Sequence, residues 1–308
     1  MMTYTRGMPT TLTDPKKAQI AFIGMGVFGQ ALASLVERNG LNYDYAEPNK
    51  PLSQPADLVF LTVPTQHLRE ALEANKPFLS EQTIIVNAAK GIEEATHLMP
   101  HQIVFSSGKY RHYYCVIGPS FADGISAQDP TSVSLGYKDP TFLPLIRKAL
   151  ETPYFRLETT RGFRALELAS ALKNLYAITC GYATGLGFGA NTRAQLITIA
   201  LQEFTTLAKA MHFADYNPIT AGVVGDLVLT CSSEQSRNFQ YGLALARSQT
   251  AGHSQPPSDT VEGYYTSRSI NVIAKRYGTQ LPLASLTSRI VSGRVHGASK
   301  FRKFLATY

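Results

Sequence analysis

One short stretch near the N-terminus limits the folds open to this chain. The segment Gln19 to Ile23 is a short apolar run typical of a buried parallel strand. Gly24, Gly26 and Gly29 follow directly, and a helical pattern then runs from about Gln30 to Arg38. A strand, a GxGxxG turn and a helix in this order form the fingerprint of a dinucleotide-binding βαβ unit.

Each glycine of this turn has a separate physical role. Gly24 would permit the tight turn, Gly26 would let a pyrophosphate approach the backbone, and Gly29 would let the helix pack closely on the strand. The anion would sit on the helix N-terminus, where N–H groups and the helix dipole favour it. Val27 and Phe28, between the glycines, are expected to touch the cofactor. A glycine-rich turn without a ligand is the alternative interpretation.

An acidic residue about twenty positions further on should hold the adenosine ribose. Asp44 and Glu47 are both candidates, and Glu47 is preferred because it lies nearer the end of the second predicted strand. An acid there repels a 2′-phosphate and favours NAD, whereas Lys50 could serve NADP. We therefore expect NAD or NADP, with NAD slightly favoured. A solvated loop acid is the alternative for Glu47.

The rest of the first half alternates between strand-like and helix-like patterns. Helical patterns lie between several of the strands, for example from Thr65 to Ala74. This alternation predicts an α/β fold with a Rossmann-type, doubly wound parallel sheet. The further strands are predicted at Tyr43 to Ala46, Leu58 to Val63, Thr83 to Asn87, Tyr114 to Ile117 and Ser132 to Leu135.

The pattern changes near residue 160, after which the chain is mostly helical. One helix is predicted from about Arg164 to Gly181, and another begins near Asn191, a good cap residue. Gln249 to Thr260 is polar and proline-rich, and we interpret it as a surface loop. The expected organisation is a flexible leader at residues 1–17, a dinucleotide-binding domain at 18–158 and an all-helical substrate-binding and catalytic domain at 159–308.

Composition narrows the classes of partner and compartment. The formal net charge is +7, and we interpret the basic residues as scattered over the sequence, which suits phosphate-bearing ligands better than a nucleic acid. A merely basic surface is the alternative interpretation of the charge. Cys115, Cys180 and Cys231 show neither a disulfide framework nor metal-binding spacing. No stretch reaches the roughly 18 apolar residues of a membrane span. We expect a cytoplasmic protein with no nucleic-acid partner, no membrane span and no metal.

Lys173 is the most unusual charged residue of the helical half. Between Ala165 and Cys180 only Glu167 and Lys173 are charged, and Lys173 shares its helix face with apolar side chains. Burial lowers the pKa of a lysine and so makes it competent for proton transfer near neutral pH. Structural pairing with an acid is the alternative.

Seven runs of residues resemble the NAD(P)-dependent glycerol-3-phosphate dehydrogenases of the bacterial type. They occur in that family's order and at compatible spacing, and the resemblance covers most of residues 18–40 and 57–295. The order of seven motifs is far more specific than any one of them. The runs are NAAKGIE at 87–93, GPSFA at 118–122, ALKN at 171–174, GFGANTR at 187–193, GDLVLTC at 225–231, SRN at 236–238 and VEG at 261–263.

The resemblance implies a role for each matching position. Lys173 would exchange the proton at the substrate's C2 oxygen, and Lys90 would be a second active-site lysine that touches substrate and cofactor. Asn174 and Asp226 would hold the substrate hydroxyls and orient Lys173. A helix cap is an equally good interpretation of Asp226 taken alone.

The remaining positions would bind the phosphate, line the site or touch the cofactor. An arginine fork suits a phosphate monoester, so Arg237 with Asn238 would hold that group, helped by Ser236. The other implied contacts are Gly118 and Ser120 to substrate, and Ala122, Glu262 and Arg237 to cofactor.

The chain departs from the family between its second and third predicted strands. Only ten residues run from Glu47 to Ala56, whereas a parallel crossover with a helix needs about a dozen or more. We therefore expect this sheet to lack the helix and strand that the family normally has there, beside the adenosine pocket.

These features together predict an oxidoreductase that interconverts sn-glycerol 3-phosphate and dihydroxyacetone phosphate. The resemblance further implies a homodimer and a role in supplying glycerol 3-phosphate for phospholipid synthesis. Two alternatives stay open: a related dehydrogenase acting on another small hydroxy acid, and a non-catalytic dinucleotide-binding sensor or scaffold. A non-phosphorylated substrate would not need Arg237 and Asn238, and a sensor would bind cofactor without turning it over.

Overall fold

A computed structural model describes residues 14–250 and 261–307 of the chain. The described residues form two compact units. The first holds the residues up to Ala89 together with His101–Val116 and Ser120–Phe163. The second holds Lys90–Pro100, Ile117–Pro119 and the residues from Arg164 onward. The domain boundary at residues 158 and 159 stays a prediction.

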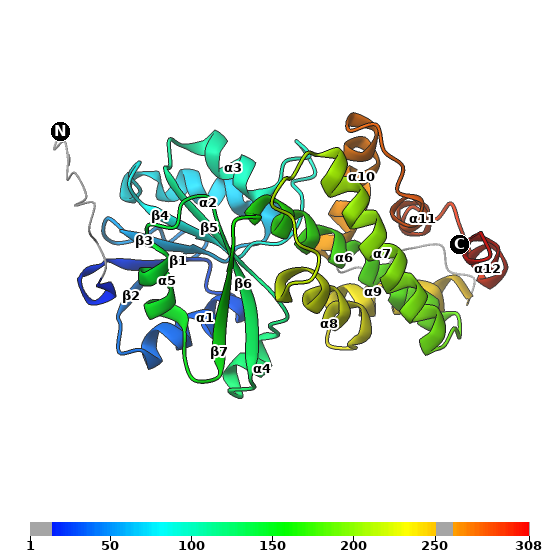
Figure 1. Ribbon diagram of the computed structural model, residues 1–308, viewed down its shortest axis with the longest axis horizontal. Coiled ribbons are helices and arrows are strands. Elements are labelled where there is room, and N and C mark those ends of the chain that lie inside the picture. Colours follow the sequence, from blue (N-terminus) through cyan, green and yellow to red (C-terminus); the bar gives the residue numbers. More distant parts are fainter. Residues whose placement is uncertain (1–13, 251–260, 308) are drawn as a thin grey trace. The chain divides into compact units, whose positions relative to one another are not determined.

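The first unit is built on a seven-stranded sheet, drawn as arrows in Figure 1. Its strand order is β2-β1-β3-β4-β5-β6-β7. β1 pairs in parallel with both β2 and β3, and the pairs β3–β4, β4–β5 and β6–β7 are parallel as well. The strands are β1 (Ile20–Ile23), β2 (Tyr43–Ala46), β3 (Leu58–Leu61), β4 (Ile84–Asn87), β5 (His112–Ile117), β6 (Thr131–Tyr137) and β7 (Phe155–Thr160).

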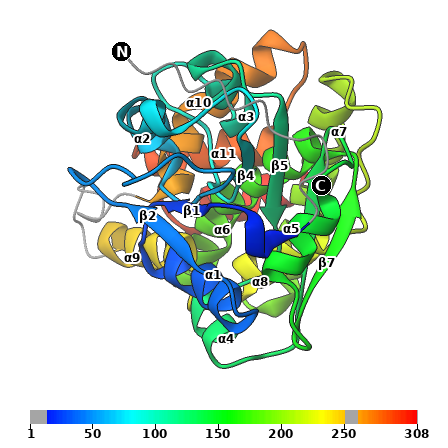
Figure 2. The ribbon, with the colours of Figure 1, turned by 90° about the vertical axis from the view of Figure 1, so that its left-hand side faces the viewer.

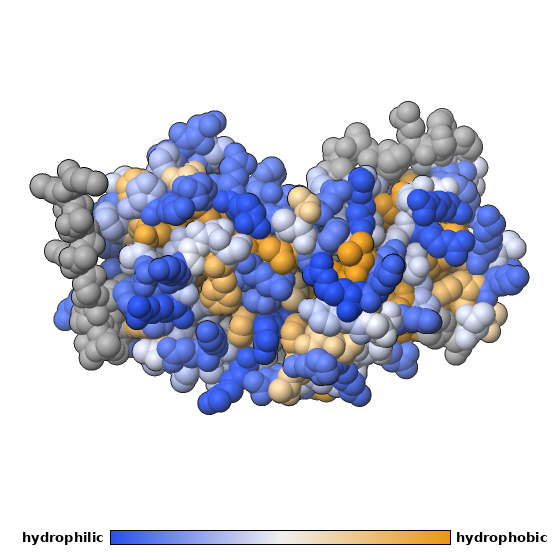
Figure 3. Space-filling view, turned by 90° about the horizontal axis from the view of Figure 1, so that it is seen from above, coloured by the Kyte–Doolittle hydropathy of each residue, from blue (hydrophilic) through white to orange (hydrophobic). Residues whose placement is uncertain are grey.

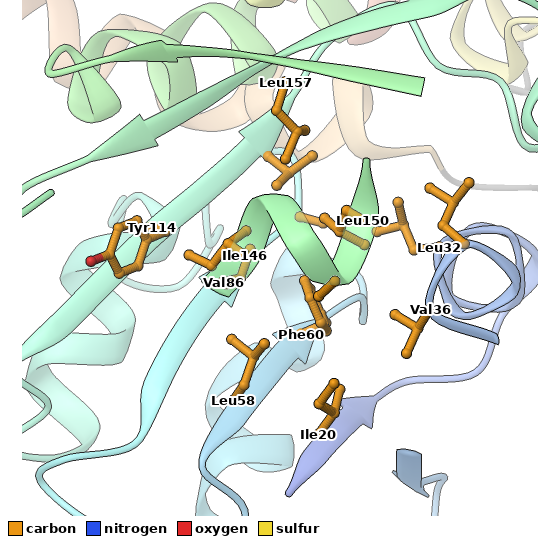
Figure 4. Packing of buried hydrophobic residues seen from close by; sticks show 14 of the residues in the cluster. Ile20, Leu32, Val36, Leu58, Phe60, Val86, Tyr114, Ile146, Leu150 and Leu157 are labelled. Carbon is orange, nitrogen blue, oxygen red and sulfur yellow. The ribbon is translucent and has the colours of Figure 1, made fainter. Parts of the chain in front are cut away.

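Helices cover both faces of this sheet, as Figure 2 shows. On one face, side chains of α1 and α5 form a continuous apolar core with alternate strand residues, and Figure 4 labels ten members of this cluster, including Leu32, Phe60 and Ile146. The predicted α/β, doubly wound fold is therefore confirmed. The helices are α1 (Val27–Arg38), α2 (Leu68–Asn75), α3 (Pro100–Ser107), α4 (Ala122–Ser126) and α5 (Leu143–Leu150).

The sheet ends at β2 because the segment that follows is too short to add another strand. Residues 47–57 hold no helix and no named strand. The chain instead makes a tight turn in which Glu47 and Lys50 exchange two backbone hydrogen bonds of 2.9 Å each. Asn49 takes a positive φ of 66° within this turn. The predicted loss of a helix and a strand at this edge is confirmed.

The second unit is helical. Its longest helix, α6, presents few exposed residues and is surrounded by the others. No helix among the described residues is long and apolar enough to span a membrane. The helices are α6 (Phe163–Gly185), α7 (Ala190–Ala210), α8 (Asp226–Ser232), α9 (Arg237–Thr250), α10 (Glu262–Arg276), α11 (Pro282–Val291) and α12 (Ala298–Leu305), with a π-helical turn at Ala221–Gly225.

Several local predictions were wrong. Strand β7 was missed because it is half-buried at the sheet edge, with only Phe155 and Leu157 fully inside. Asn191 does not cap its helix; Gly189 is the N-cap, and Asn191 lies within α7. Helix α6 continues to Gly185, four residues beyond the predicted end at Gly181.

Two predicted irregular segments begin or end in regular structure. Pro15–Lys17, assigned to the flexible leader, form a 3₁₀ turn that Asp14 caps by accepting a hydrogen bond from the Lys16 N–H. Gln249 and Thr250, assigned to the surface loop, belong to the last turn of α9. The rest of the leader and of that loop lies outside the described residues.

Candidate functional site

The glycine-rich turn between β1 and α1 has the geometry that a dinucleotide requires. Gly24 takes a φ of +103°, and a Cβ there would lie 2.7 Å from Val63 Cγ1. A Cβ on Gly29 would overlap the carbonyl oxygen of Gly24. A Cβ on Gly26, which caps α1, would meet nothing within 4 Å. Gly24 and Gly29 are therefore fixed by packing, whereas the space over Gly26 is open to a ligand.

The turn lies at the topological switch point of the sheet. The chain runs from β1 to its neighbour β2 on one side and then to β3 on the other, and ligands of open α/β sheets bind outside the carboxyl ends of the strands at such a point. A pocket of about 390 Å³ opens there. Its lining includes Gly24, Glu47, Lys50 and the apolar Ala71 and Ala74, which suits an adenosine moiety.

Glu47, the acid predicted to hold the ribose, lies at the end of β2. Glu47 directly follows β2, lines this pocket and is exposed. Lys50, its partner in the tight turn, holds its ammonium nitrogen 4.1 Å from the centre of the Tyr45 ring. Asp44, the other candidate, accepts hydrogen bonds from the Ser53 backbone and hydroxyl. Of the two candidate acids, Glu47 lines this pocket and Asp44 does not.

In the second unit, one buried carboxylate contacts both predicted active-site lysines. Lys173 Nζ donates to Asp226 Oδ1 at 2.5 Å, and Lys90 Nζ lies 3.4 Å from Asp226 Oδ2. Lys173 is only 6% exposed and Asp226 1%. Asp226 is the first residue of α8 and directly follows the π-helical turn Ala221–Gly225. The acid pairing considered for Lys173 is therefore present, within a cluster of two cations and one anion.

The environment of Lys173 shifts its titration toward neutral pH. Burial lowers the pKa of Lys173 to about 8, with Asp226 opposing this shift and the nearby Lys90 adding to it. A lysine with such a pKa is populated in both its charged and its neutral form at physiological pH. It can therefore give up and take back a proton, so pairing with Asp226 does not exclude acid–base chemistry.

Sequence reasoning missed Thr230. Its Oγ1 accepts a hydrogen bond from Lys173 Nζ at 2.9 Å and donates to the Asp226 backbone oxygen at 2.6 Å. Thr230 is fully buried and holds the lysine nitrogen from a second side. The signal was present, because Asp226 and Thr230 stand four residues apart and so share one helix face.

Asn174 and Asn238, both predicted to bind substrate, are brought together by a contact that the sequence did not indicate. Asn238 Nδ2 donates to Asn174 Oδ1 at 3.1 Å, and Asn238 Oδ1 accepts from the Gly263 backbone N–H at 2.9 Å. Both asparagines are buried. The Asn238 carboxamide thus joins α6 to the N-terminus of α10.

The predicted phosphate residues open helix α9. Arg237 is its first residue and is exposed, and no carboxylate within residues 14–250 and 261–307 forms an ion pair with it. Ser236 is buried, and its Oγ accepts a hydrogen bond from the Phe239 N–H at 3.3 Å. An arginine at a helix N-terminus is unfavourable for the helix dipole unless an anion sits beside it.

The remaining predicted residues lie at the starts of helices or in the connecting segment after β5. Gly118 belongs to the second unit and Ser120 to the first. Ala122 is the first residue of α4, and it packs against the core of the first unit. Glu262 is the first residue of α10 and is half-buried.

The net positive charge does not mark the phosphate site. Hydrophilic side chains are spread over the face drawn in Figure 3. The net charge, however, is not spread evenly along the sequence. Residues 263–308 hold eight Lys and Arg and no Asp or Glu. The other 21 basic and 22 acidic residues give residues 1–262 a net charge of −1. None of the predicted site residues lies in that basic C-terminal segment, so the interpretation of the surplus as scattered was wrong.

Comparison with known proteins identifies the family. A family model described as the NAD-dependent glycerol-3-phosphate dehydrogenase C-terminus matches residues 163–299, and the model for the N-terminus of the same family matches residues 46–143. The chain belongs to the NAD-dependent glycerol-3-phosphate dehydrogenase family. The N-terminal match of this dehydrogenase family begins at the end of β2, so the glycine-rich turn lies outside the matched range.

Individual dehydrogenases of this family resemble the chain over most of its length. A "Glycerol-3-phosphate dehydrogenase [NAD(P)+]" of Maridesulfovibrio salexigens is 33% identical over 307 residues, covering 89% of this chain and 93% of that protein. One of Lawsonia intracellularis is 34% identical over 262 residues, covering 84% and 74%. The crystal structure of the Coxiella burnetii glycerol-3-phosphate dehydrogenase superposes with a TM-score of 0.80 at 25% identity, covering 95% of this chain and 99% of that one.

Proposed function

We propose that this chain is an NAD(P)-dependent oxidoreductase that interconverts sn-glycerol 3-phosphate and dihydroxyacetone phosphate. The observation that carries the proposal is the buried Lys173, whose nitrogen contacts Asp226 and Thr230 and whose pKa is lowered to about 8. Such a group fits the proton exchange that any alcohol–ketone interconversion needs. Family membership supplies the substrate class.

The lysine cluster accounts for the charge that develops on the substrate oxygen. Reduction of the ketone places negative charge on the C2 oxygen, which Lys173 neutralises by donating a proton. Lys90, on the other side of Asp226, adds a second positive charge in a site largely closed to water, where such charges are most effective. Asp226 and Thr230 keep the Lys173 nitrogen in place, and in the reverse direction neutral Lys173 takes the proton from the alcohol.

The start of α9 suits the phosphate of the substrate. Arg237 offers up to five N–H donors in a fixed fork, and the N-terminus of α9 favours an anion. Ser236 is the adjacent hydroxyl. Binding the phosphate away from the reacting carbon would position that carbon for reaction, because the binding energy of a remote group is used to orient the substrate.

The first unit fits a dinucleotide, whose nicotinamide accepts or supplies the hydride when bound. The open backbone at Gly26 and the N-terminus of α1 would hold the pyrophosphate, with Val27, 71% exposed, and Phe28 beside it. Glu47 would accept hydrogen bonds from the adenosine ribose and repel a 2′-phosphate, so we propose a modest preference for NAD. Ala122 and Glu262 are assigned to the cofactor by family resemblance.

Three finer parts of the proposal rest on family resemblance or, for the location, on the absence of a disulfide framework. They are a homodimeric assembly, a cytoplasmic location and the supply of glycerol 3-phosphate for phospholipid synthesis. The assembly is the simplest to test, because light scattering during size-exclusion chromatography distinguishes a mass of 33.7 kDa from twice that value.

The decisive experiment follows the absorbance of NADH, and separately NADPH, with dihydroxyacetone phosphate. Wild type and Lys173→Ala are compared at equal concentration, with unphosphorylated dihydroxyacetone as a second substrate. We expect wild type to oxidise NADH and the variant to lose turnover by about 10²- to 10⁴-fold. The phosphorylated substrate should be strongly preferred.

Each other outcome would point to a different function. If wild type binds cofactor but turns over neither substrate, the chain is a dinucleotide-binding sensor. If dihydroxyacetone is used as efficiently as its phosphate, the assignment of Arg237 fails and a different hydroxy compound is the substrate.

A further inference from the structure

The orientation of a buried side-chain amide can be determined here from the backbone. The two ends of an asparagine carboxamide have almost the same shape, and only hydrogen-bond partners distinguish them. A main-chain N–H can only donate, so the Asn238 atom that contacts the Gly263 nitrogen at 2.9 Å must be the oxygen. The Asn238 nitrogen therefore faces Asn174.

The orientation of the Asn174 carboxamide follows from that of Asn238. Because the Asn238 nitrogen donates, the Asn174 atom that it contacts at 3.1 Å must be the carbonyl oxygen. The Asn174 amide nitrogen is thereby turned away from Asn238, with two N–H donors to offer. Asn174 directly follows Lys173 on α6 and is buried, and the family resemblance assigns it to the groups that hold the substrate hydroxyls.

Close packing of α10 against α6 holds these hydrogen-bonded groups in place. A Cβ on Gly263 would overlap the main-chain carbonyl oxygen of Asn174. It would also lie 2.7 Å from the main-chain carbonyl carbon of Asn174 and 2.7 Å from Asn238 Oδ1. Only glycine lets the first turn of α10 approach α6 this closely. Gly263 is the second residue of α10, where a backbone N–H has no partner inside the helix, and Asn238 satisfies it.

We propose that Asn238 is a positioning residue that sets the orientation of the Asn174 carboxamide, so that Asn174 presents N–H donors, and not its oxygen, to the substrate oxygens. The proposal rests on the proposed dehydrogenase function. It differs from the phosphate contact expected for Asn238, because Asn238 would act through Asn174. A donor aimed at an oxygen that gains negative charge stabilises the transition state, whereas a reversed carboxamide would repel it.

Asn238→Asp is the variant that tests this orientation. The aspartate keeps the size of the side chain and still accepts from the Gly263 N–H, but it places a second oxygen against Asn174 Oδ1. The Asn174 carboxamide should then rotate by about 180°, so that its nitrogen faces the new carboxylate and its oxygen faces the substrate. We expect kcat for dihydroxyacetone phosphate to fall about 10- to 100-fold, the range for loss of one hydrogen bond to a charged group.

Two comparisons separate positioning from phosphate binding. With unphosphorylated dihydroxyacetone, the positioning role predicts the same fold loss, whereas a phosphate contact predicts that the loss disappears. In an Asn174→Ala background, the positioning role predicts that Asn238→Asp has no further effect on kcat. Multiplicative losses in the double variant, or a loss seen only in KM for the phosphorylated substrate, would overturn the proposal.

Controls guard against unfolding and against a general effect of losing an amide. Asn39 is a part-buried asparagine of the first unit whose Nδ2 donates to the Ala149 and Glu151 carbonyls, so Asn39→Asp should leave kcat unchanged. If Asn238→Asp does not fold, Asn174→Asp replaces it: Asn238 still donates to the new carboxylate, but the N–H donors are gone. Wild-type turnover by Asn174→Asp would overturn the proposal.

The proposal and the dehydrogenase function fail in different ways. Absence of turnover by wild type would refute the function. The contact itself would still be measurable, because coupling between Asn238→Asp and Asn174→Ala in the free energy of unfolding needs no substrate. Additive effects on unfolding would show that the two carboxamides do not interact.

Discussion

Lys173 and Asp226 form a buried ion pair of 2.5 Å, so replacing Asp226 would leave the charge of Lys173 uncompensated. Breaking such a pair typically costs about 3–5 kcal/mol. Here Lys90 lies on the far oxygen of the same carboxylate, so removing Asp226 would also leave two ammonium groups facing each other. The cluster is therefore arranged around the acid.

The pH dependence of the two reaction directions should be opposite. Reduction needs protonated Lys173 and oxidation needs the neutral form, and the pKa of Lys173 is about 8. The kcat for dihydroxyacetone phosphate reduction should fall as the pH rises above 8, and that for glycerol 3-phosphate oxidation should fall below it. Initial rates between pH 6 and 10 at saturating substrate measure both limbs. If kcat for both directions changed in the same sense with pH, Lys173 would be ruled out as the proton donor.

Asp226→Asn should shift the fall in kcat for dihydroxyacetone phosphate reduction to lower pH. The carboxylate opposes the effect of burial on the pKa of Lys173, so its loss should lower that pKa further. We expect kcat at pH 7.5 to fall by about 10²-fold or more and the descending limb to shift toward acid. Thermal unfolding of the same sample controls for stability. A lower kcat with an unshifted limb would mean that Asp226 does not control the titration.

Thr230→Val should weaken the hold on Lys173 while preserving the shape of the side chain. The variant removes the oxygen that lies 2.9 Å from Lys173 Nζ. A hydrogen bond to a charged group contributes about 1.5–3 kcal/mol, so kcat should fall roughly 10- to 100-fold. Thr230→Ser keeps the hydroxyl and serves as the matched control. Equal activities of the valine and serine variants would contradict the role given to Thr230.

Alanine substitutions in the glycine turn should separate folding from cofactor binding. Gly24→Ala places a Cβ against Val63 at a φ of +103°, and it should destabilise the protein by roughly 1–3 kcal/mol. Gly26→Ala meets no protein atom, and it should leave the melting temperature unchanged while weakening NADH binding at least tenfold. Calorimetry and a fluorescence titration provide the two readouts. Unchanged NADH affinity in Gly26→Ala would place the pyrophosphate elsewhere.

The sequence was most informative where function depends on local order. The glycine turn needs a strand before it and a helix after it, and both are encoded within about twenty residues. Lys173 was recognisable because a charge stands alone on an apolar helix face. The short segment after Glu47 could be interpreted by counting residues, since chain length limits what a crossover can contain.

Contacts between distant residues were beyond the same reasoning. Thr230 and Lys173 are 57 residues apart, and Asn238 and Asn174 are 64 apart, so no periodicity links them. The orientation of the Asn174 carboxamide depends on a backbone N–H of α10, which has no signature in residue type beyond the glycine itself. Strand β7 was missed for a simpler reason: only Phe155 and Leu157 of its six residues are buried.

The short turn after β2 has a further consequence for the behaviour of the chain in concentrated solution. Because no strand within residues 14–250 and 261–307 lies beyond β2, its outer backbone groups form an edge onto which another polypeptide could add. Pro48 and Pro51 have no N–H to donate there, the Asp44 carboxylate is occupied by Ser53, and the Lys50 ammonium lies over Tyr45. The segment that shortens the sheet thus also limits how far an added strand could pair beyond Ala46.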